Sequence, residues 1–332
     1  MRRYFALILM VALFLGFLTM NTFAANIPDK LKEAVLYLGC GEATGPGKIV
    51  KVNLKGKKLG EISLEAEPGS LCASLGNIYV SLPSDGSKKM GPGKVLKLDS
   101  EGGIISSFAD GKMFFRPVSI TASDYPPAWF VVCNRLDHVV RVAYDEEPEV
   151  VFTTEPPSVF SQNYSLATTG KLLLVATDDP EPGVRAVDLT AKDGKYPVKK
   201  LLPFDGVVAA QRNSDRWVAT QIPMRRLPVV SVGRYVPLPD EPVYLHVFNG
   251  TQEIKKIPCP KSKGWYCRYT KKPWEPHSYW GWGPISFCGD RLVIAIMEKQ
   301  GKSLYLADLD SGQFQFLFHW KQGRLVSLAA TP

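Results

Sequence analysis

The residues of this sequence best suited to chemistry are cations and aromatic rings in two long segments. Residues 222–242 contain Arg225, Arg226 and Arg234. Residues 257–283 hold four of the seven tryptophans, and the rings that we single out are Trp265, Tyr266, Trp274, Trp280 and Trp282. Arginine and large aromatic residues dominate recognition surfaces. The arginines and aromatic residues of the two segments therefore predict ligand binding by charge-assisted hydrogen bonds and ring stacking. The alternative is that the arginines are solvated and the rings fill the interior of their own segment.

Catalytic patterns do not occur in the sequence. It contains no H-E-x-x-H, no G-x-S-x-G, no phosphate-binding Gly-rich loop and no Cys/His spacing of the zinc kind. The acidic residues of 178–181 lie in a Pro-rich context that is typical of a solvated loop. We favour structural roles for the four histidines, which are His138, His246, His277 and His319. The sequence therefore predicts no cofactor, no metal and a non-enzymatic function, with the question of enzymatic activity left open.

The six cysteines fall into two groups. Cys259 and Cys267 bracket a short stretch, and we predict a disulfide between them because an exported chain meets an oxidising compartment. The other four lie on apolar, strand-like segments, where cysteine serves as a small buried hydrophobe. Their pairing stays open, and they are Cys40, Cys72, Cys133 and Cys288.

The first 24 residues have the pattern of a secretory signal peptide. Arg2 and Arg3 precede an apolar run, and Thr22-Phe23-Ala24 offers a cleavage site. Removal of residues 1–24 takes away these two arginines and lowers the net charge from +8 to +6, which favours anionic partners weakly. We predict a secreted or periplasmic protein. An uncleaved signal anchor, which would hold the protein near the membrane, is the alternative.

A repeat organises the remaining chain. Residues 45–53 read GPGKIVKVN and residues 91–99 read GPGKVLKLD, the same nonapeptide displaced by 46 positions. Weaker copies are alternating strands that end in Asp or Asn, at Asp145, Asp188, Asn249 and Asp308. The alternation indicates half-buried strands, and the terminal Asp or Asn suits a following turn.

Three more strand-like segments surround each copy, which gives six units of four antiparallel strands. The first unit lacks an inner strand, and residues 324–330 resemble one. We therefore predict an all-β fold, a six-bladed β-propeller of four-stranded antiparallel blades whose ring is closed by the C-terminal strand. Residues 26–332 form one domain in this interpretation.

The repeated strand G-x-[IV]-x-[KR]-[VL]-[DN] resembles the six-bladed propellers of the NHL-repeat and gluconolactonase-like (senescence-marker) superfamily, over roughly residues 34 to 330. The resemblance implies the fold, whereas function varies within such folds. Enzymes of that superfamily hold a divalent ion at one end of the channel, on residues that lead into the inner strands. The equivalent residues here are Ser70, Arg116, Asn163, Asp205, Pro284 and Arg324. Because Arg116 and Arg324 would repel a dication, we predict that they bind an anionic ligand.

The two long segments leave the same face of the predicted propeller, beside these arginines. Our leading hypothesis is an exported non-enzymatic propeller that binds a partner protein, or an anionic or glycan ligand of the envelope, through this face. The alternative is a metal-dependent hydrolase or lactonase of the gluconolactonase-like kind. Export argues against nucleic acid as the partner of the basic, aromatic segment.

Overall fold

The computed structural model describes most of the chain in sixteen ranges. They are residues 27–41, 46–84, 93–108, 116–124, 127–133, 138–143, 146–153, 165–177, 183–191, 195–204, 206–220, 225–226, 235–236, 244–258, 282–298 and 301–332. Within them, no helix has the length and apolar character needed to cross a membrane. The described helical structure is a short 3-10 turn, η1 (Asp29–Leu31).

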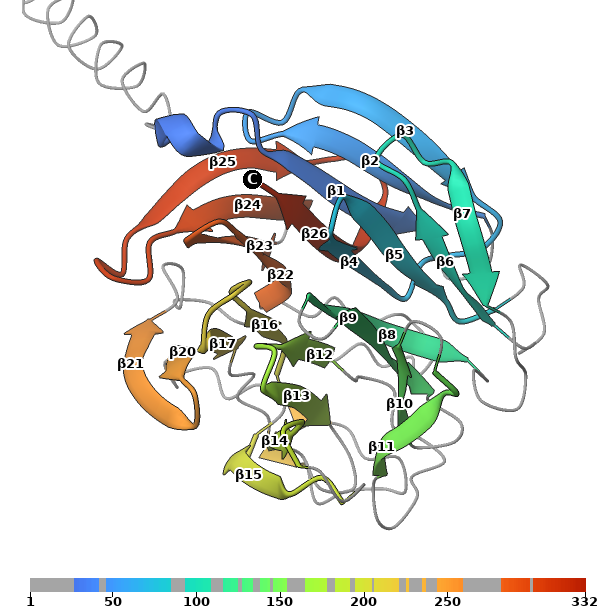
Figure 1. Cartoon of the computed structure of the whole chain (residues 1–332). Helices are drawn as coiled ribbons and strands as arrows, with labels where there is room; N and C mark the ends of the chain where they lie inside the picture. The colour runs from blue at the N-terminus through green and yellow to red at the C-terminus, as the bar shows by residue number, and fades with distance from the viewer. Residues whose placement is uncertain are drawn as a thin grey trace, which may run out of the picture.

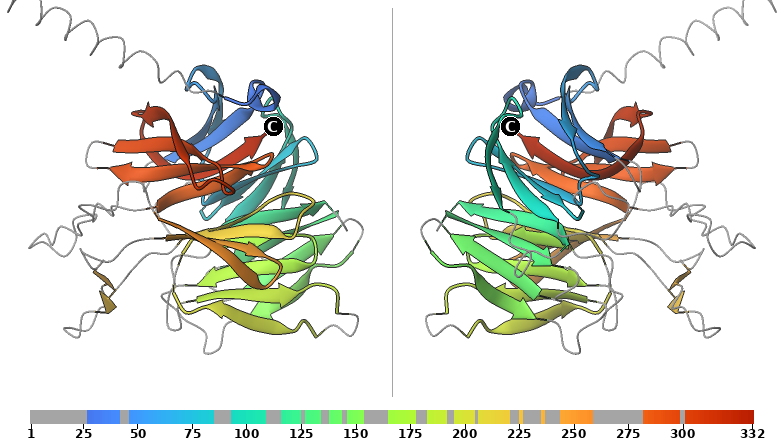
Figure 2. Two further views of the ribbon diagram at one scale, coloured as in Figure 1. Left: turned by 90° about the vertical axis from the view of Figure 1, so that its left-hand side faces the viewer. Right: turned by 90° about the vertical axis from the view of Figure 1, so that its right-hand side faces the viewer.

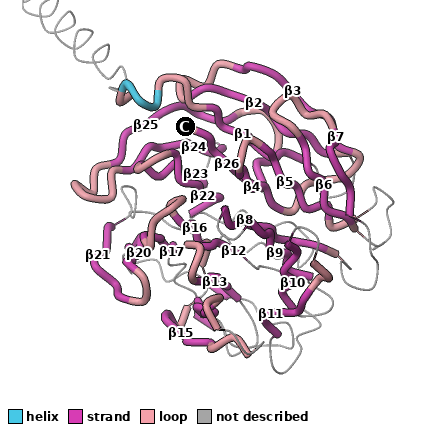
Figure 3. The backbone as a smooth tube through the Cα atoms, viewed as in Figure 1, coloured by secondary structure: helices cyan, strands magenta, loops and turns pink. Residues whose placement is uncertain are grey.

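Six four-stranded antiparallel sheets make up the fold, and they stand around a common centre as blades 1 to 6 (Figures 1 and 3). Blades 1 to 3, from the inner strand outwards, are β26 (Arg324–Thr331), β1 (Val35–Gly41), β2 (Gly47–Asn53), β3 (Lys58–Leu64); β4 (Ser70–Ser74), β5 (Asn77–Leu82), β6 (Lys94–Leu98), β7 (Ile104–Phe108); and β8 (Pro117–Asp124), β9 (Pro127–Cys133), β10 (His138–Ala143), β11 (Glu149–Thr153).

Blades 4 to 6 follow the same order. They are β12 (Ser165–Thr168), β13 (Leu172–Thr177), β14 (Gly183–Asp188), β15 (Val198–Leu202); β16 (Val208–Ala210), β17 (Arg216–Thr220), β20 (Tyr244–Asn249), β21 (Gln252–Pro258); and β22 (Trp282–Cys288), β23 (Arg291–Glu298), β24 (Gly301–Ala307), β25 (Phe314–Trp320). A separate two-stranded pair joins β18 (Arg225–Arg226) to β19 (Tyr235–Val236). The predicted six-bladed, all-β propeller is confirmed.

The C-terminal strand closes the ring, as predicted. β26 lies antiparallel to β1, from Val35 opposite Thr331 to Gly41 opposite Arg324. Each inner strand also lies against the inner strands of the two neighbouring blades, in the circular order β26, β4, β8, β12, β16 and β22. Blade 1 is therefore built from both ends of the described chain, which meet beside each other (Figure 1).

The burial of each strand follows from its place in a blade. Second strands are covered on both faces by neighbouring blades, so β5 and β13 are almost continuous runs of buried residues. Outer strands are covered less, so β3 and β21 are mostly exposed. The repeated Asn or Asp after the third strand accepts hydrogen bonds from the backbone of the turn. Its Oδ1 atom lies 2.8 to 3.1 Å from those nitrogens at Asn53, Asp99, Asp188 and Asp308.

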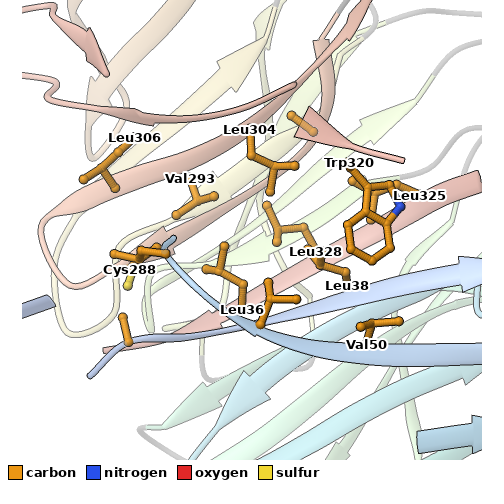
Figure 4. Close-up of a cluster of buried hydrophobic side chains, with 14 of the residues drawn as sticks. Leu36, Leu38, Val50, Cys288, Val293, Leu304, Leu306, Trp320, Leu325 and Leu328 are labelled. Atoms are coloured by element: carbon orange, nitrogen blue, oxygen red, sulfur yellow. The ribbon is translucent and has the colours of Figure 1, made fainter. Parts of the chain in front are cut away.

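The core lies between the blades, and one cluster joins blade 6 to blade 1. Leu36 and Leu38 of β1 pack there with Leu304 and Leu306 of β24 and with Leu328 of β26 (Figure 4). Ring closure is thus stabilised by apolar packing as well as by strand pairing. The same cluster includes two of the cysteines that we predicted as small buried hydrophobes, Cys40 and Cys288, and both are buried free thiols.

Candidate binding face

Two kinds of connection emerge on one face of the ring: those from the second to the third strand of a blade, and those from an outer strand to the next inner strand. We call this the insertion face. The chain between β17 and β20 and the chain between β21 and β22 both belong to it. The β18–β19 pair lies outside the ring, on the side to which β23 and β24 also extend (Figure 2).

The described residues include only part of the predicted ligand-binding set. Arg225 and Arg226 form β18, where their backbone pairs with Val236 and Tyr235. Trp282 starts β22, so this residue, which we had assigned to the insertion, begins an inner strand opposite Ile296. Predicted residues that lie outside the described ranges are Arg234, Trp265, Tyr266, Trp274, Trp280 and the predicted disulfide pair Cys259 and Cys267. That these residues lie together on one face and bind the ligand stays a prediction.

The two arginines predicted at the channel lie at the starts of inner strands on the insertion face. Arg116 immediately precedes β8 and has a φ of 54°, in the left-handed region that few non-glycine residues adopt. Arg324 starts β26. Because β26 and β8 flank β4 in the ring, the arginines lie on either side of the blade 2 inner strand. Asn163 and Asp205, from the same predicted set, lie outside the described ranges.

A β-bulge sets the direction of Arg324. The pairing of β26 with β1 shifts by one residue, and Val326 is the residue left out. Leu325 and Leu328 would face opposite sides of a regular strand, yet both pack in the cluster between blades 6 and 1. The bulge therefore reverses the alternation and turns Arg324 away from that cluster, towards blade 2.

Glu67 meets Arg324 on that side. It lies in the connection from β3 to β4, and its side chain is only 20 % exposed. The connection crosses blade 1 closely: a Cβ atom on Gly41 would come 2.7 Å from Cγ of Glu67, and one on Gly47 would come 2.5 Å from the carbonyl oxygen of Ala66. Glycine at these two positions leaves room for the Glu67 segment. The Glu67 Oε1 atom is 3.7 Å from Nη1 of Arg324.

Lys302 completes the group, which we call the Glu67 cluster: Glu67, Lys302 and Arg324. The ammonium of Lys302 donates a hydrogen bond to the carbonyl of Leu325, next to Arg324. Burial and the nearby charge of Arg324 lower the pKa of Lys302 from 10.5 to about 8, while Cys40 and Glu67 oppose the shift. Burial raises the pKa of Glu67, and the two cations oppose that shift. One partly buried carboxylate thus lies under the charge of two cations, of which Arg324 is its ion-pair partner.

Sequence reasoning identified Arg324 in this cluster but missed Glu67 and Lys302. A signal for Lys302 did exist, because it follows Gly301 at the start of a third strand, as Lys48 follows Gly47 and Lys94 follows Gly93. Lys48 and Lys94 form ion pairs with Glu61 and Glu65. Glu67 has no comparable signal, since it lies between strands in a segment without a repeat.

Two other polar pairs in the described structure join neighbouring strands of one blade. His246 Nδ1 lies 2.5 Å from Glu253 Oε1 across β20 and β21, and burial lowers the pKa of this histidine despite the carboxylate. Ser303 Oγ and His319 Nδ1 are 2.8 Å apart, but Ser303 is fully buried and unsuited to attack a substrate. Within the described ranges, no three His, Cys, Asp or Glu side chains are grouped to hold a metal ion.

No family model matches the sequence, and no curated protein matches it. Solved structures match the fold. A chain of the nidogen/laminin complex has a TM-score of 0.59 at 13% identity, over 90% of this chain and 98% of that chain. TolB from Acinetobacter baumannii has a TM-score of 0.56 at 15% identity, over 93% and 69%. The periplasmic gluconolactonase of Pseudomonas aeruginosa has a TM-score of 0.48 at 13% identity, over 87% and 83%.

At such low identities, the matches to the nidogen/laminin chain and to TolB show a shared propeller fold alone. The fold implied by the superfamily resemblance is therefore confirmed, whereas membership of the NHL-repeat and gluconolactonase-like superfamily stays a prediction.

Proposed function

We propose that this protein is an exported, non-enzymatic propeller that binds a partner protein, or an anionic or glycan ligand of the envelope, through its insertion face. One observation carries the proposal: the two longest connections leave the same face that bears the Glu67 cluster. Long connections on a rigid scaffold commonly supply binding residues. The cluster adds a local excess of positive charge to that face.

The nature of the ligand follows from the same groups. Arginine guanidinium groups form paired hydrogen bonds with carboxylate and phosphate, and tryptophan faces stack on sugars and cations. A chain of the nidogen/laminin complex shares the fold, which supports a protein as partner. Export is part of the proposal and rests on the first 24 residues of the sequence. N-terminal sequencing of protein isolated from the envelope should give Ala25 as the first residue.

The test compares two double variants for capture of envelope components by the mature protein. We expect Arg225→Ala with Arg226→Ala to reduce capture roughly tenfold without loss of stability, because it removes two cations from the β18–β19 pair, which is separate from the six blades. Trp280→Ala with Trp282→Ala should also reduce capture. Captured glycans and proteins are identified by mass spectrometry, and thermal unfolding of each variant is measured in parallel.

The matched control is Lys55→Ala with Lys57→Ala, which removes two exposed lysines from the β2–β3 turn on the opposite face. It should leave capture unchanged. If the arginine variant captures as the wild type does while the tryptophan variant unfolds, the insertions are structural and the proposal is wrong. A calcium-dependent rise in melting temperature, with metal in the purified protein, would support the hydrolase or lactonase alternative instead.

A further inference from the structure

We propose that Lys302 and Arg324 form a subsite for one oxyanion group of the ligand, a carboxylate or a phosphate, and that Glu67 competes with that group for the two cations. This inference rests on the proposed function, because it assigns a chemical group to the same face. It differs from the sequence prediction in its residues, since neither Lys302 nor Glu67 belonged to the predicted set.

The first step is the weak engagement of Arg324. Its side chain is 59% exposed, and its guanidinium lies 3.7 Å from the Glu67 carboxylate, beyond hydrogen-bond distance. Other arginines on this fold engage their carboxylates fully: Arg141 lies 2.7 Å from Glu146, and Arg216 lies 2.7 Å from Asp310. The bulge at Val326 directs Arg324 towards blade 2 without bringing it into a hydrogen bond with Glu67.

The second step is the charge of the cluster. Lys302 and Arg324 carry two positive charges against one carboxylate, and Lys302 and Glu67 are both partly buried. Each ion in such a place is costly unless it is paired. One further negative charge would make the cluster neutral. A ligand that brings one oxyanion is therefore favoured, and a second negative charge close by would meet Glu67.

The third step is the hydrogen-bonding capacity. The Lys302 ammonium has three donor hydrogens, and the described contact uses one of them, towards the Leu325 carbonyl. That carbonyl belongs to the residue after Arg324, so the Lys302 ammonium lies at the start of β26, the strand end that carries Arg324. An oxygen anion placed between them would accept charge-assisted hydrogen bonds from both.

The experiment is isothermal titration of the full mature chain at constant ionic strength, with inorganic phosphate as one probe and glucuronate as the other. Whichever probe binds more tightly identifies the oxyanion as phosphate or carboxylate.

Arg324→Ala and Lys302→Met should each weaken binding roughly tenfold, the effect of one lost charge-assisted hydrogen bond. Glu67→Gln should tighten binding by about threefold to tenfold, because it removes the competing charge. The control is Lys94→Met, the equivalent repeat position in blade 2, which should bind as the wild type does.

A second readout is the pH dependence of binding. The charged and titratable groups around Lys302 are Arg324, Glu67 and the thiol of Cys40, whose pKa burial raises to about 11, and the lysine loses its proton with a pKa of about 8. Affinity should therefore fall as the pH rises above about 8, and Lys302→Met should abolish this dependence. Tighter binding by Glu67→Gln is not expected of a carboxylate that is merely structural.

Two results would overturn the subsite. One is that neither probe binds the wild type at concentrations up to roughly 50 mM. A dissociation constant above that value means less binding free energy than a single useful ion-pair contact provides. The other is binding that Arg324→Ala and Lys302→Met leave unchanged. If envelope capture persists in either case and depends on Arg225 and Arg226, the proposed function stands and only this subsite is wrong.

Discussion

At the scale of single residues, the same repeat position produces different chemistry in different blades. Lys48, Lys94 and Lys302 each follow a glycine at the start of a third strand. The first two form ion pairs with nearby glutamates. Lys302 is partly buried beside β26 and donates to a backbone carbonyl instead. A lysine that forms an ordinary surface ion pair in two blades becomes a costly, partly buried charge where the ring closes.

Replacing this lysine should stabilise the protein at neutral pH. Burial lowers the pKa of Lys302 from 10.5 to about 8, so the protonated form is disfavoured by folding. The cost is complete below pH 8, where both states are protonated, and disappears as the pH rises towards 10.5. Lys302→Met should therefore raise the free energy of unfolding by about 1 kcal/mol at pH 7, after allowance for the lost hydrogen bond and for solvent screening. Urea unfolding at pH 7 and pH 10 measures the difference, which should shrink at the higher pH. An equal gain at both pH values would contradict the assignment of the cost to charge.

The predicted Cys259–Cys267 disulfide is a second test at this scale. Closing so short a loop should contribute roughly 2 to 3 kcal/mol in the chain-entropy model. Peptide mass spectrometry without reduction, on protein from its native compartment, should find the two cysteines linked. Cys288, a buried thiol whose pKa burial raises to about 11, should stay unmodified by alkylating reagents in the folded protein and serves as the control. Free thiols at both 259 and 267 would refute the pairing.

At the scale of elements, the strand edges of every blade are protected. Each outer strand leaves one residue out of its pairing with the third strand, at Leu59, Ile105, Val151, Leu201, Ile254 and Leu317. Bulges of this kind interrupt an edge that could otherwise pair with another chain. On the inner side, serine hydroxyls accept hydrogen bonds from backbone N–H groups of the next inner strand: Ser119 from Leu166, Ser165 from Val208 and Ser286 from Ala330.

Loss of one such serine should destabilise the junction between two blades. Ser119 Oγ is buried and lies 3.2 Å from the backbone nitrogen of Leu166. Ser119→Ala leaves that buried N–H without its acceptor, so the free energy of unfolding should fall by about 1 to 2 kcal/mol. Ser107→Ala, at an exposed position on β7, should change it by less than about 0.5 kcal/mol. Equal effects of the two substitutions in denaturant titrations would show that the hydroxyl of Ser119 does not stabilise the junction.

At the scale of the whole molecule, the features that could be predicted from the sequence are those that repeat along the chain. The strands and the closing segment were predictable because alternation and the Asp or Asn turn recur in every blade. The bulges were not predictable, because no residue type in the sequence marks the one position that is left unpaired. Contacts that depend on closure were also beyond sequence reasoning. Glu67 reaches Arg324 only because residues 257 positions apart meet at the ring junction. Arg212, in blade 5, donates to the carbonyl of Ala73 in the opposite blade 2, at 3.3 Å across the centre of the ring.

Ring closure by β26 gives the last prediction. β26 is the inner strand of blade 1, and six of its partner positions run from Val35 to Cys40. Deleting residues 323–332 exposes the edge of β1 and opens the core cluster that Leu325 and Leu328 share with blade 6. Cooperative unfolding should be lost, because apolar surface of several side chains is no longer buried and two neighbouring blades lose their contact. Circular dichroism during thermal unfolding, together with sedimentation, measures the outcome.

A circular permutant supplies the control for that deletion. Thr331 pairs with Val35, and its hydroxyl lies 3.5 Å from the Val35 carbonyl oxygen, so the end of β26 is next to the start of β1. Moving residues 323–332 in front of Ala34 through a short Asn-Gly turn converts the closure into a hairpin with the same strand pairing. The permutant should unfold cooperatively, at a melting temperature somewhat below that of the wild type, because it keeps every strand but loses the buried Leu31 of the segment before Ala34. A truncated chain that unfolds as cooperatively as this permutant would show that the ring does not need its sixth inner strand.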